Sequence, residues 1–425
     1  MSLPCPKVFE QKVKDIELLK DECAPGGLMM EEGITSITFF KGNFQPASDA
    51  LLAQFLRVVS SNPWLAGRLV KTKQGIRLRH PINPVASGDY DSLVSVVPPS
   101  SSPDTPTLTP NTPYVDMCNA MYKSKKQIIV PSGNASLDKD KPVTLLTLVA
   151  TTPLQFALVF SMSHVVGDGR TYYEIFKMLS PGAAIRELTS DRIMSFSESM
   201  RDTCGRKEME WADSTSTAIM YTLATLPTML GCGAKARCYA FHLDDARLAE
   251  LKRDCARDGG VPYVTTNDIL TSGFFNACGS RIGMMGFDCR EKLDECHRDL
   301  AGNYVSALIL DSDVFGTPAR LRRMYSSRPY KTTGRPLPKC CCGAASFAMV
   351  TNWSSFAGEM VALRGCEMII HLPVLNPAYC VYDIMIPFAS AVGKKGVLCW
   401  TVSTDEDGLR EAMPLGDRVS KDMFP

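Results

Sequence analysis

Hydrophobic and polar positions follow two different periods along this chain, and the two periods alternate. Short apolar runs of strand length are followed by stretches in which apolar residues recur every three or four positions, the spacing of one helix face. In the first part of the chain this pattern predicts strands at 32–40, 143–150 and 154–162, and helices at 47–60 and 171–179. Strands that alternate with helices in this way indicate an α/β protein with mixed sheets and flanking helices.

The same alternation resumes after residue 235. Strands are predicted at 236–243, 345–353, 382–387 and 396–403, and helices at 245–259 and 265–281. Between the two parts the periodicity weakens, and Pro181 and Pro227 interrupt it, which predicts a long irregular connection. We therefore divide the chain into an N-terminal half (1–180), a crossover segment (181–235) and a C-terminal half (236–425).

Composition narrows the classes of function. The 46 basic and 45 acidic residues leave a net charge of +1, so no basic surface for nucleic acid is expected. The uncharged stretch Val143–Gly167 contains Pro153 between two short strands and is not a transmembrane helix. Residues 1–7 lack an apolar signal region, which predicts a cytoplasmic protein, with a monomer as the default.

Cysteine and histidine usage bears on metals and redox chemistry. In the cytoplasm the 16 cysteines are expected to stay reduced. Cys340–Cys342 is their one cluster, but three adjacent cysteines cannot all turn onto one metal without strain, and no nearby histidine completes a tetrahedral set. No metal site and no tightly bound cofactor are therefore predicted.

The segment with the clearest candidate catalytic residues follows the predicted strand at 154–162. The strand ends just before His164, and Asp168 and Gly169 come four and five residues later, at the start of a predicted helix. A histidine at a strand end can reach a substrate as a general base. We expect Asp168 to hold the loop through an arginine, and Gly169 to leave room and tolerate an unusual backbone conformation. The alternative is a core histidine in a strand-to-helix turn.

Several motifs together resemble a known family. His164–Gly169 has the form H-x-x-x-D-G, the signature of acyl-CoA-dependent acyltransferases with the chloramphenicol acetyltransferase fold. Asn62–Val70 ends in L-A-G-R-L-V, Thr265–Leu270 reads T-x-N-D-x-L, Asp288–Arg290 reads D-x-R, and Gly302-Asn303 is a G-N pair. Their order over residues 30–415 resembles the BAHD acyltransferases, a branch of that superfamily.

The resemblance implies both a fold and a reaction. The fold would be two similar half-domains with an active-site tunnel between them. Coenzyme A thioester would enter from one face as co-substrate and a small acceptor from the other. His164 would act as general base, and the acyl group would pass to a hydroxyl, with an amine as second choice and without an acyl-enzyme. The residues that contact coenzyme A are not identifiable from the sequence.

The resemblance also assigns roles to three further residues. Arg290 would pair with Asp168 and tie the histidine loop to the second half, although it could instead pair with Asp288 or stay solvated. Thr351 and Trp353 match a T-S-W or S-S-W triplet that faces the histidine in the family. They are candidates for stabilising the oxyanion or orienting the substrate. A tryptophan packed in the core is the alternative for Trp353.

One departure from the family bears on whether the protein is an enzyme or a catalytically silent binding protein. The family's D-F-G-W-G loop is replaced here by Ala357–Cys366, which marks a divergent member. This loss favours a catalytically silent ligand-binding protein on the same scaffold, whereas the intact His164 motif opposes it. A wax-ester or acylglycerol acyltransferase is a further alternative, but such enzymes usually carry a second histidine where this chain has Ser163.

Overall fold

A computed structural model describes residues 12–24, 26–98, 106–232, 234–338, 346–356 and 360–425. The predictions made for residues 1–7 and for Cys340–Cys342 lie outside these ranges. Among the described residues, no helix is long and apolar enough to cross a membrane.

The N-terminal half contains a large and a small sheet. Its elements are β1 Val13–Glu17, β2 Ile34–Gly42, α1 Phe44–Ser61, β3 Arg68–Thr72, β4 Gly75–Pro81, β5 Val94–Val97, α2 Tyr114–Tyr122, α3 Gly133–Ser136, β6 Thr144–Thr152, β7 Gln155–Met162 and α4 Gly169–Met178. The small sheet has the order β1-β4-β3, and β2, β7, β6 and β5 form most of the five-stranded sheet. The strands and helices predicted for this half are therefore present.

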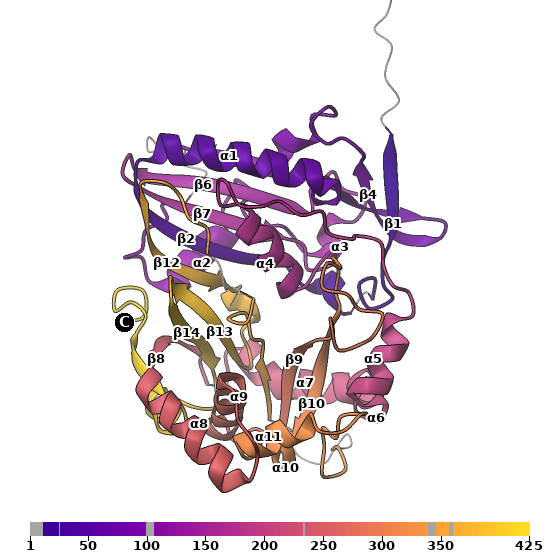
Figure 1. Cartoon of the computed structure of the whole chain (residues 1–425), viewed down its shortest axis with the longest axis vertical. Coiled ribbons are helices and arrows are strands. Elements are labelled where there is room, and N and C mark those ends of the chain that lie inside the picture. The colour runs from indigo at the N-terminus through magenta and orange to yellow at the C-terminus, as the bar shows by residue number, and fades with distance from the viewer. Residues whose placement is uncertain (1–11, 25, 99–105, 233, 339–345, 357–359) are drawn as a thin grey trace, which may run out of the picture.

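The C-terminal half is built around one larger sheet. Its elements are β8 Arg237–Leu243, α8 Asp245–Gly259, α9 Thr266–Ala277, β9 Ile282–Asp288, β10 Val305–Asp311, α10 Ser312–Phe315, α11 Pro318–Met324, β11 Phe347–Val350, β12 Cys366–Val374, β13 Asp383–Ala391, β14 Lys394–Thr401, α12 Glu406–Ala412 and β15 Leu415–Arg418. Seven strands pair in the order β10-β9-β11-β13-β14-β8-β15. Figure 1 shows this sheet and its helices below the N-terminal sheet.

One strand crosses from the C-terminal half into the first sheet. β12 pairs antiparallel with β2 and completes the five-stranded order β12-β2-β7-β6-β5. A strand of the predicted C-terminal half thus belongs to the sheet of the N-terminal half and joins the two halves by a hydrogen-bonded ladder. The boundaries at 180 and 235 stay a prediction.

The prediction of an irregular crossover segment is wrong. Residues 181–235 include three helices, α5 Phe196–Cys204, α6 Arg206–Ala212 and α7 Thr215–Met229. Pro227 lies inside the last turn of α7, where it ends the helix without preventing it. Because α7 carries apolar residues around its whole circumference, it shows no single apolar face, and periodicity alone misses it.

Two predicted boundaries also need correction. The helix expected to run to Arg281 ends at Ala277, because Gly279 adopts a left-handed conformation (φ +58°) that stops it. The strand expected at 345–353 is shorter, β11 covering only Phe347–Val350. The start of the helix predicted at 265–281 is confirmed, since Thr265 and Asp268 form a reciprocal capping box on α9.

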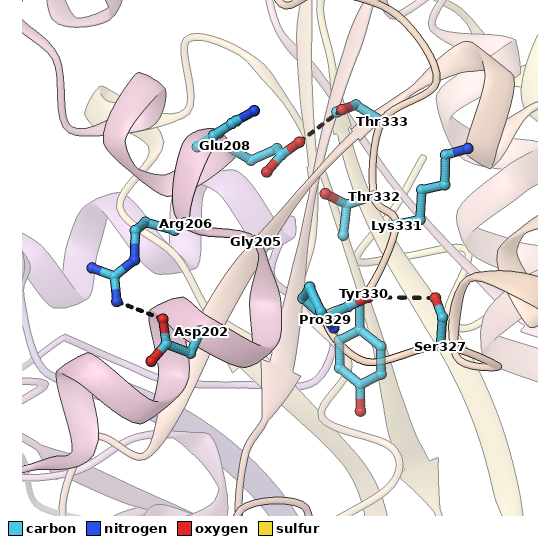
Figure 2. Close-up of a pocket in the computed structure, with 11 residues that line it drawn as sticks. Asp202, Gly205, Arg206, Glu208, Ser327, Pro329, Tyr330, Lys331, Thr332 and Thr333 are labelled. Atoms are coloured by element: carbon cyan, nitrogen blue, oxygen red, sulfur yellow. Dashed lines mark hydrogen bonds and ion pairs between the residues drawn. The ribbon is translucent and has the colours of Figure 1, made fainter.

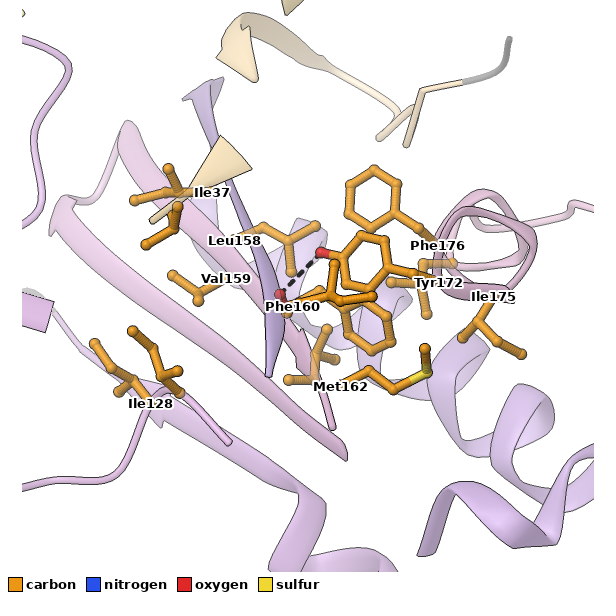
Figure 3. Close-up of a cluster of buried hydrophobic side chains, with 14 of the residues drawn as sticks. Ile37, Ile128, Leu158, Val159, Phe160, Met162, Tyr172, Ile175 and Phe176 are labelled. Atoms are coloured by element: carbon orange, nitrogen blue, oxygen red, sulfur yellow. Dashed lines mark hydrogen bonds between the residues drawn. The ribbon is translucent and has the colours of Figure 1, made fainter. Parts of the chain in front are cut away.

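The core of the N-terminal half holds the segment that leads to His164. Apolar side chains of β2, β7 and α4 interdigitate there (Figure 3), and the rings of Phe160 and Tyr172 lie 5.1 Å apart. The Tyr172 hydroxyl donates a hydrogen bond of 2.9 Å to the backbone oxygen of Phe160. The strand before the histidine turn and the helix after it are therefore packed rigidly against each other.

A buried histidine connects β12 to this core. His371 is fully buried, and its two ring nitrogens share hydrogen bonds with Thr38 (2.8 Å) and Tyr173 (3.0 Å). Burial lowers the pKa of His371 from 6.5 to about 3. In the unfolded chain the imidazole takes up a proton below pH 6.5, whereas the folded protein keeps it neutral. Its contribution to stability is therefore complete above pH 6.5 and is lost as the pH falls from 6.5 towards 3.

We expect this histidine to give an acid-sensitive stability. Between pH 6.5 and 5 the wild type should lose roughly 2 kcal/mol more than His371→Gln, which has no imidazole to protonate. Urea unfolding midpoints measured across this range test the difference in slope. His297→Gln, at an exposed histidine, should follow the wild-type slope. Parallel slopes for the wild type and His371→Gln would contradict the prediction.

Candidate active site

His164 lies in the turn directly after β7, and its side chain is 23% exposed. The ring nitrogen Nδ1 lies 3.2 Å from Oδ1 of Asn303, which follows Gly302 in the loop before β10. The histidine is thus held by a residue of the C-terminal half while part of its ring faces solvent.

The hydrogen bonds of Asn303 decide which ring nitrogen is free. Its Nδ2 donates to a carboxylate oxygen of Glu22 (3.0 Å) and to the backbone oxygen of His164 (2.8 Å), so its Oδ1 must face the imidazole. Because an amide oxygen only accepts, Nδ1 of His164 carries the hydrogen. In the neutral ring the lone pair is then on Nε2, the atom that a general base needs.

A buried ion pair holds Asn303 in turn. Glu22 is fully buried and accepts hydrogen bonds from the Arg192 guanidinium (2.9 Å) and from the backbone amide of Asn303 (2.9 Å). Arg192, from the crossover segment, also donates to the backbone oxygen of Val166 in the histidine turn (3.0 Å). The turn is therefore fixed by residues from three distant parts of the chain.

The pair predicted between Asp168 and Arg290 is present. Two guanidinium nitrogens of Arg290 lie 2.8 and 3.3 Å from the two carboxylate oxygens of Asp168, and both side chains are almost completely buried. Arg290 also contacts Asp288 at 3.0 Å, so the alternative partner is engaged as well. The remaining Arg290 donors bind the backbone oxygens of Leu300 and Gly302.

Asp168 is also a structural cap. It accepts hydrogen bonds from the backbone amides of Thr171 at the start of α4 (2.9 Å) and of Tyr304 (3.0 Å). Burial by itself would raise the pKa of Asp168, but the charge and hydrogen bonds of Arg290 outweigh it and lower the pKa. The aspartate therefore stays ionised and organises the loop through Arg290 and these backbone amides.

The expectation of an unusual backbone at Gly169 is wrong. Gly169 is the first residue of α4, and its φ is not in the left-handed region. A Cβ built there would meet the Phe356 ring at 3.7 Å and the Trp353 indole at 3.8 Å, both ordinary contacts. Gly167 is more constrained, because a Cβ there would lie 2.8 Å from the methyl carbon of Thr171.

Trp353 and Thr351 follow β11 and lie in different surroundings. Trp353 is 8% exposed, and its ring centroid lies 6.0 Å from that of Tyr173 on α4. It thus packs against the helix that follows the histidine motif. Thr351 is partly buried, and its hydroxyl faces Gly286 of β9. The structure brings Trp353 to Gly169, whereas the hydrogen bonds and ring contacts of the described residues do not join Thr351 or Trp353 to His164.

Glu31 stands at the free side of the imidazole. Its carboxylate oxygen lies 3.6 Å from Nε2 of His164, and its side chain is 55% exposed. A carboxylate in this position stabilises the positive charge that the ring acquires when it takes a proton. Glu31 follows a short 3-10 helix (Leu28–Met30) that packs beside α3, an arrangement that local sequence does not reveal.

A separate cavity of about 570 Å³ opens between α5, α6 and residues 327–333 (Figure 2). Lys207 and Lys331 line it, and Thr333 donates a hydrogen bond of 2.8 Å to Glu208 across it. Its described lining residues do not include any member of the His164 network. The cavity is therefore not part of the candidate active site.

Comparisons with known proteins agree on the fold. No protein-family model matches the sequence, and no curated protein sequence matches it. Among solved structures, F. graminearum TRI101 complexed with coenzyme A and deoxynivalenol is similar over 96% of this chain and 100% of its own, with TM-score 0.58 and 15% identity. The first condensation domain of the calcium-dependent antibiotic synthetase is similar over 96% and 99%, with TM-score 0.57 and 14% identity.

A third solved structure is polyketide synthase associated protein 5 from Mycobacterium tuberculosis. It is similar over 94% of this chain and 96% of its own, with TM-score 0.56 and 13% identity. The chain therefore has the mixed α/β chloramphenicol acetyltransferase-like fold, with two sheet-rich halves and flanking helices, as predicted.

Sequence reasoning missed three charged residues of the site. Glu22, Glu31 and Arg192 lie in segments without a motif, and nothing in their neighbourhood separates them from the other charged residues of the chain. The sequence indicates Asn303 only as half of the G-N pair, without a role. Its signal is the adjacent Gly302, whose φ of +137° and crowding against Arg192 require glycine.

We expect Asn303 to act as a positioning residue. Asn303→Leu should lower kcat of a reaction in which His164 is the base by about 10²-fold with little change in KM, because the ring loses the acceptor that orients it. Steady-state kinetics with both substrates varied measures the split. Asn376→Leu is the matched control, since Asn376 also donates to a glutamate (Glu32, 2.9 Å) but contacts no histidine. A loss confined to KM or to the unfolding midpoint would contradict a positioning role.

Proposed function

We propose that the protein is an acyl-CoA-dependent acyltransferase of the BAHD type. It moves an acyl group from a coenzyme A thioester to a hydroxyl, or less readily an amine, of a small acceptor. The observation that carries the proposal is the imidazole of His164, whose Nδ1–H is bound to Asn303 and whose Nε2 is left as the base. The fold it shares with a coenzyme A complex of TRI101 supports coenzyme A as co-substrate.

The proposed reaction uses one group for both proton transfers. Nε2 of His164 takes the proton of the acceptor hydroxyl as its oxygen attacks the thioester carbonyl. The tetrahedral oxyanion then collapses, the carbon–sulfur bond breaks, and the imidazolium returns its proton to the coenzyme A thiolate. Glu31, 3.6 Å from Nε2, stabilises the imidazolium between the two steps. No acyl-enzyme forms.

The other candidate residues have distinct proposed roles. Thr351 and Trp353 orient the thioester or its oxyanion from the end of β11, and positioned donors of this kind contribute roughly 3–4 kcal/mol each. Asp168, Gly169 and Arg290 are architectural, since they form and anchor the loop that carries His164. A tunnel between the halves, with substrates entering from opposite faces, is part of the same proposal, as are the cytoplasmic location and the monomer.

Release of coenzyme A tests the function directly. The purified protein is incubated with a panel of acyl-CoA donors and pooled alcohol and amine acceptors, and free thiol is measured with a chromogenic disulfide. Release that requires an acceptor supports the transferase. Binding of acyl-CoA without release would favour the silent ligand-binding alternative, and release with long-chain alcohols or acylglycerols alone would favour the wax-ester alternative. If the protein neither binds acyl-CoA nor releases coenzyme A, the coenzyme A assignment is overturned.

A further inference from the structure

The helix α7 has two apolar faces, and the residues that the structure describes cover only one of them. Its inner face packs on the seven-stranded sheet, where Tyr221 stacks edge-on against Phe347 (5.8 Å) and Tyr382 (5.6 Å). Side chains of β9 and β10 belong to the same cluster, and Figure 1 shows α7 beside these strands. The opposite face of the sheet is covered by α9, α10 and α11.

The outer face of α7 is a stripe of exposed apolar side chains. Ile219, Leu223, Leu226 and Leu230 recur at helical spacing and are 46%, 62%, 39% and 67% exposed, and Met229 beside them is 61% exposed. Isolated exposed apolar residues are common in proteins. Five on one helix face indicate a surface that a lipid bilayer or another molecule covers.

The charges around α7 are arranged with a polarity. The sequence has no charged residue between Asp213 and Lys235. The most exposed apolar side chains lie in the C-terminal half of the helix, and the first charges beyond it are Lys235 and Arg237, both exposed. Neither forms an ion pair with any residue in the described ranges. At the other end the charges are mixed, because α6 carries Arg206 and Lys207 together with Glu208 and Glu210.

We propose that the outer face of α7 docks on an anionic lipid membrane, with the helix lying in the interface and its C-terminal end deepest. Apolar side chains with basic residues beside them are the pattern of interfacial helices, in which lysine and arginine meet lipid phosphates. A helix of 15 residues is too short to span the bilayer. A second copy of the chain fits less well, because paired helices use charged residues flanking the apolar stripe to fix partner and register, and α7 has none.

Glu31 of the candidate active site acts electrostatically on the inner face of α7. After burial, the Glu31 carboxylate contributes to the raised pKa of Tyr382, about 12, and also to that of Tyr221. Glu31 is therefore within electrostatic reach of Tyr221 on α7 and of Tyr382 beneath it, and it is also 3.6 Å from His164. The membrane contact itself does not depend on the proposed function.

Vesicle co-sedimentation of the full chain tests the proposal. Vesicles of phosphatidylcholine with phosphatidylserine are compared with vesicles of phosphatidylcholine alone. The wild type should bind the mixed vesicles more strongly. Leu223→Gln combined with Leu230→Gln should reduce binding by about tenfold or more, because two apolar side chains no longer leave water. Lys235→Gln combined with Arg237→Gln should remove the preference for phosphatidylserine.

The chain offers a closely matched control. Leu154, in the turn between β6 and β7, is 63% exposed, like Leu223 at 62%. It lies at the end of β7 opposite His164, and Leu154→Gln should bind vesicles as the wild type does. Unchanged thermal midpoints verify that the exposed substitutions leave the fold intact. His164→Ala should also bind normally, which separates membrane docking from catalysis.

Three outcomes would overturn membrane docking. The first is a wild type that does not bind either kind of vesicle. The second is equal binding by the wild type and the Leu223/Leu230 variant. The third is a dimer in sedimentation velocity that the Leu223/Leu230 variant dissociates, without vesicle binding, which would assign the stripe to a second copy of the chain.

Discussion

Replacing His164 with alanine is expected to lower kcat for acyl transfer by about 10²–10⁴-fold, the usual contribution of a positioned general base. The side chain is only partly buried, and the Asn303 amide still binds the backbone oxygen of residue 164 in the variant. The turn should therefore keep its shape while the base is lost. Thiol release with a saturating acceptor measures kcat.

His297→Ala provides the control for this experiment. His297 is exposed and lies between β9 and β10, so its removal should leave both kcat and the thermal midpoint unchanged. His164→Ala should match the wild type in thermal midpoint and in acyl-CoA binding. Full activity in His164→Ala would refute the general-base role even if the protein proved to be an acyltransferase.

Replacing Arg290 with leucine is expected to destabilise the protein by about 3–5 kcal/mol, the usual cost of leaving a buried charge without its partner. Asp168 would remain buried among apolar and backbone groups, and the backbone oxygens of Leu300 and Gly302 would lose their donors. The pKa of Asp168 should rise in the variant, because burial already acts in that direction and Arg290 opposes it. Chemical denaturation followed by circular dichroism measures the change.

Two comparisons test whether the loss of stability expected for Arg290→Leu comes from leaving a buried charge without its partner. Arg257 pairs with Asp254 and Asp258 at the surface, where its side chain is 71% exposed, and Arg257→Leu should leave the unfolding midpoint unchanged. Combining Asp168→Leu with Arg290→Leu should cost less than the sum of the single changes, because no unpaired charge remains. A strictly additive result would mean that the pair contributes only through separate contacts.

The local structure of this chain could be predicted from its sequence wherever one face of an element is apolar. The helix α1 has such a pattern, and the helices α8 and α9 begin at capping side chains, Asp244 and Thr265. Periodicity does not predict elements that have apolar residues on more than one face, and α7 is the clearest example. Its two faces meet different surroundings, the sheet inside and the exterior outside, and one-dimensional spacing cannot distinguish them.

The residues of the candidate active site also fall into two groups, those that the sequence identifies and those that only the folded structure brings together. The sequence by itself determined the segment that carries His164, Asp168 and Gly169, because a strand, a turn and a helix start are local patterns. The pairing of Asp168 with Arg290 follows from the family resemblance. The unusual backbone expected at Gly169 is wrong, because Gly169 is the first residue of the helix α4 and does not lie in a strained turn.

Only the tertiary structure decided how the histidine is held. Asn303, Glu22 and Arg192 come from a loop of the second half, the segment after β1 and the crossover, and they meet His164 through hydrogen bonds between residues far apart in sequence. Polar contacts of this kind have no period and no preferred spacing along the chain. They exist because the folded core brings these groups out of water, where each must find a partner.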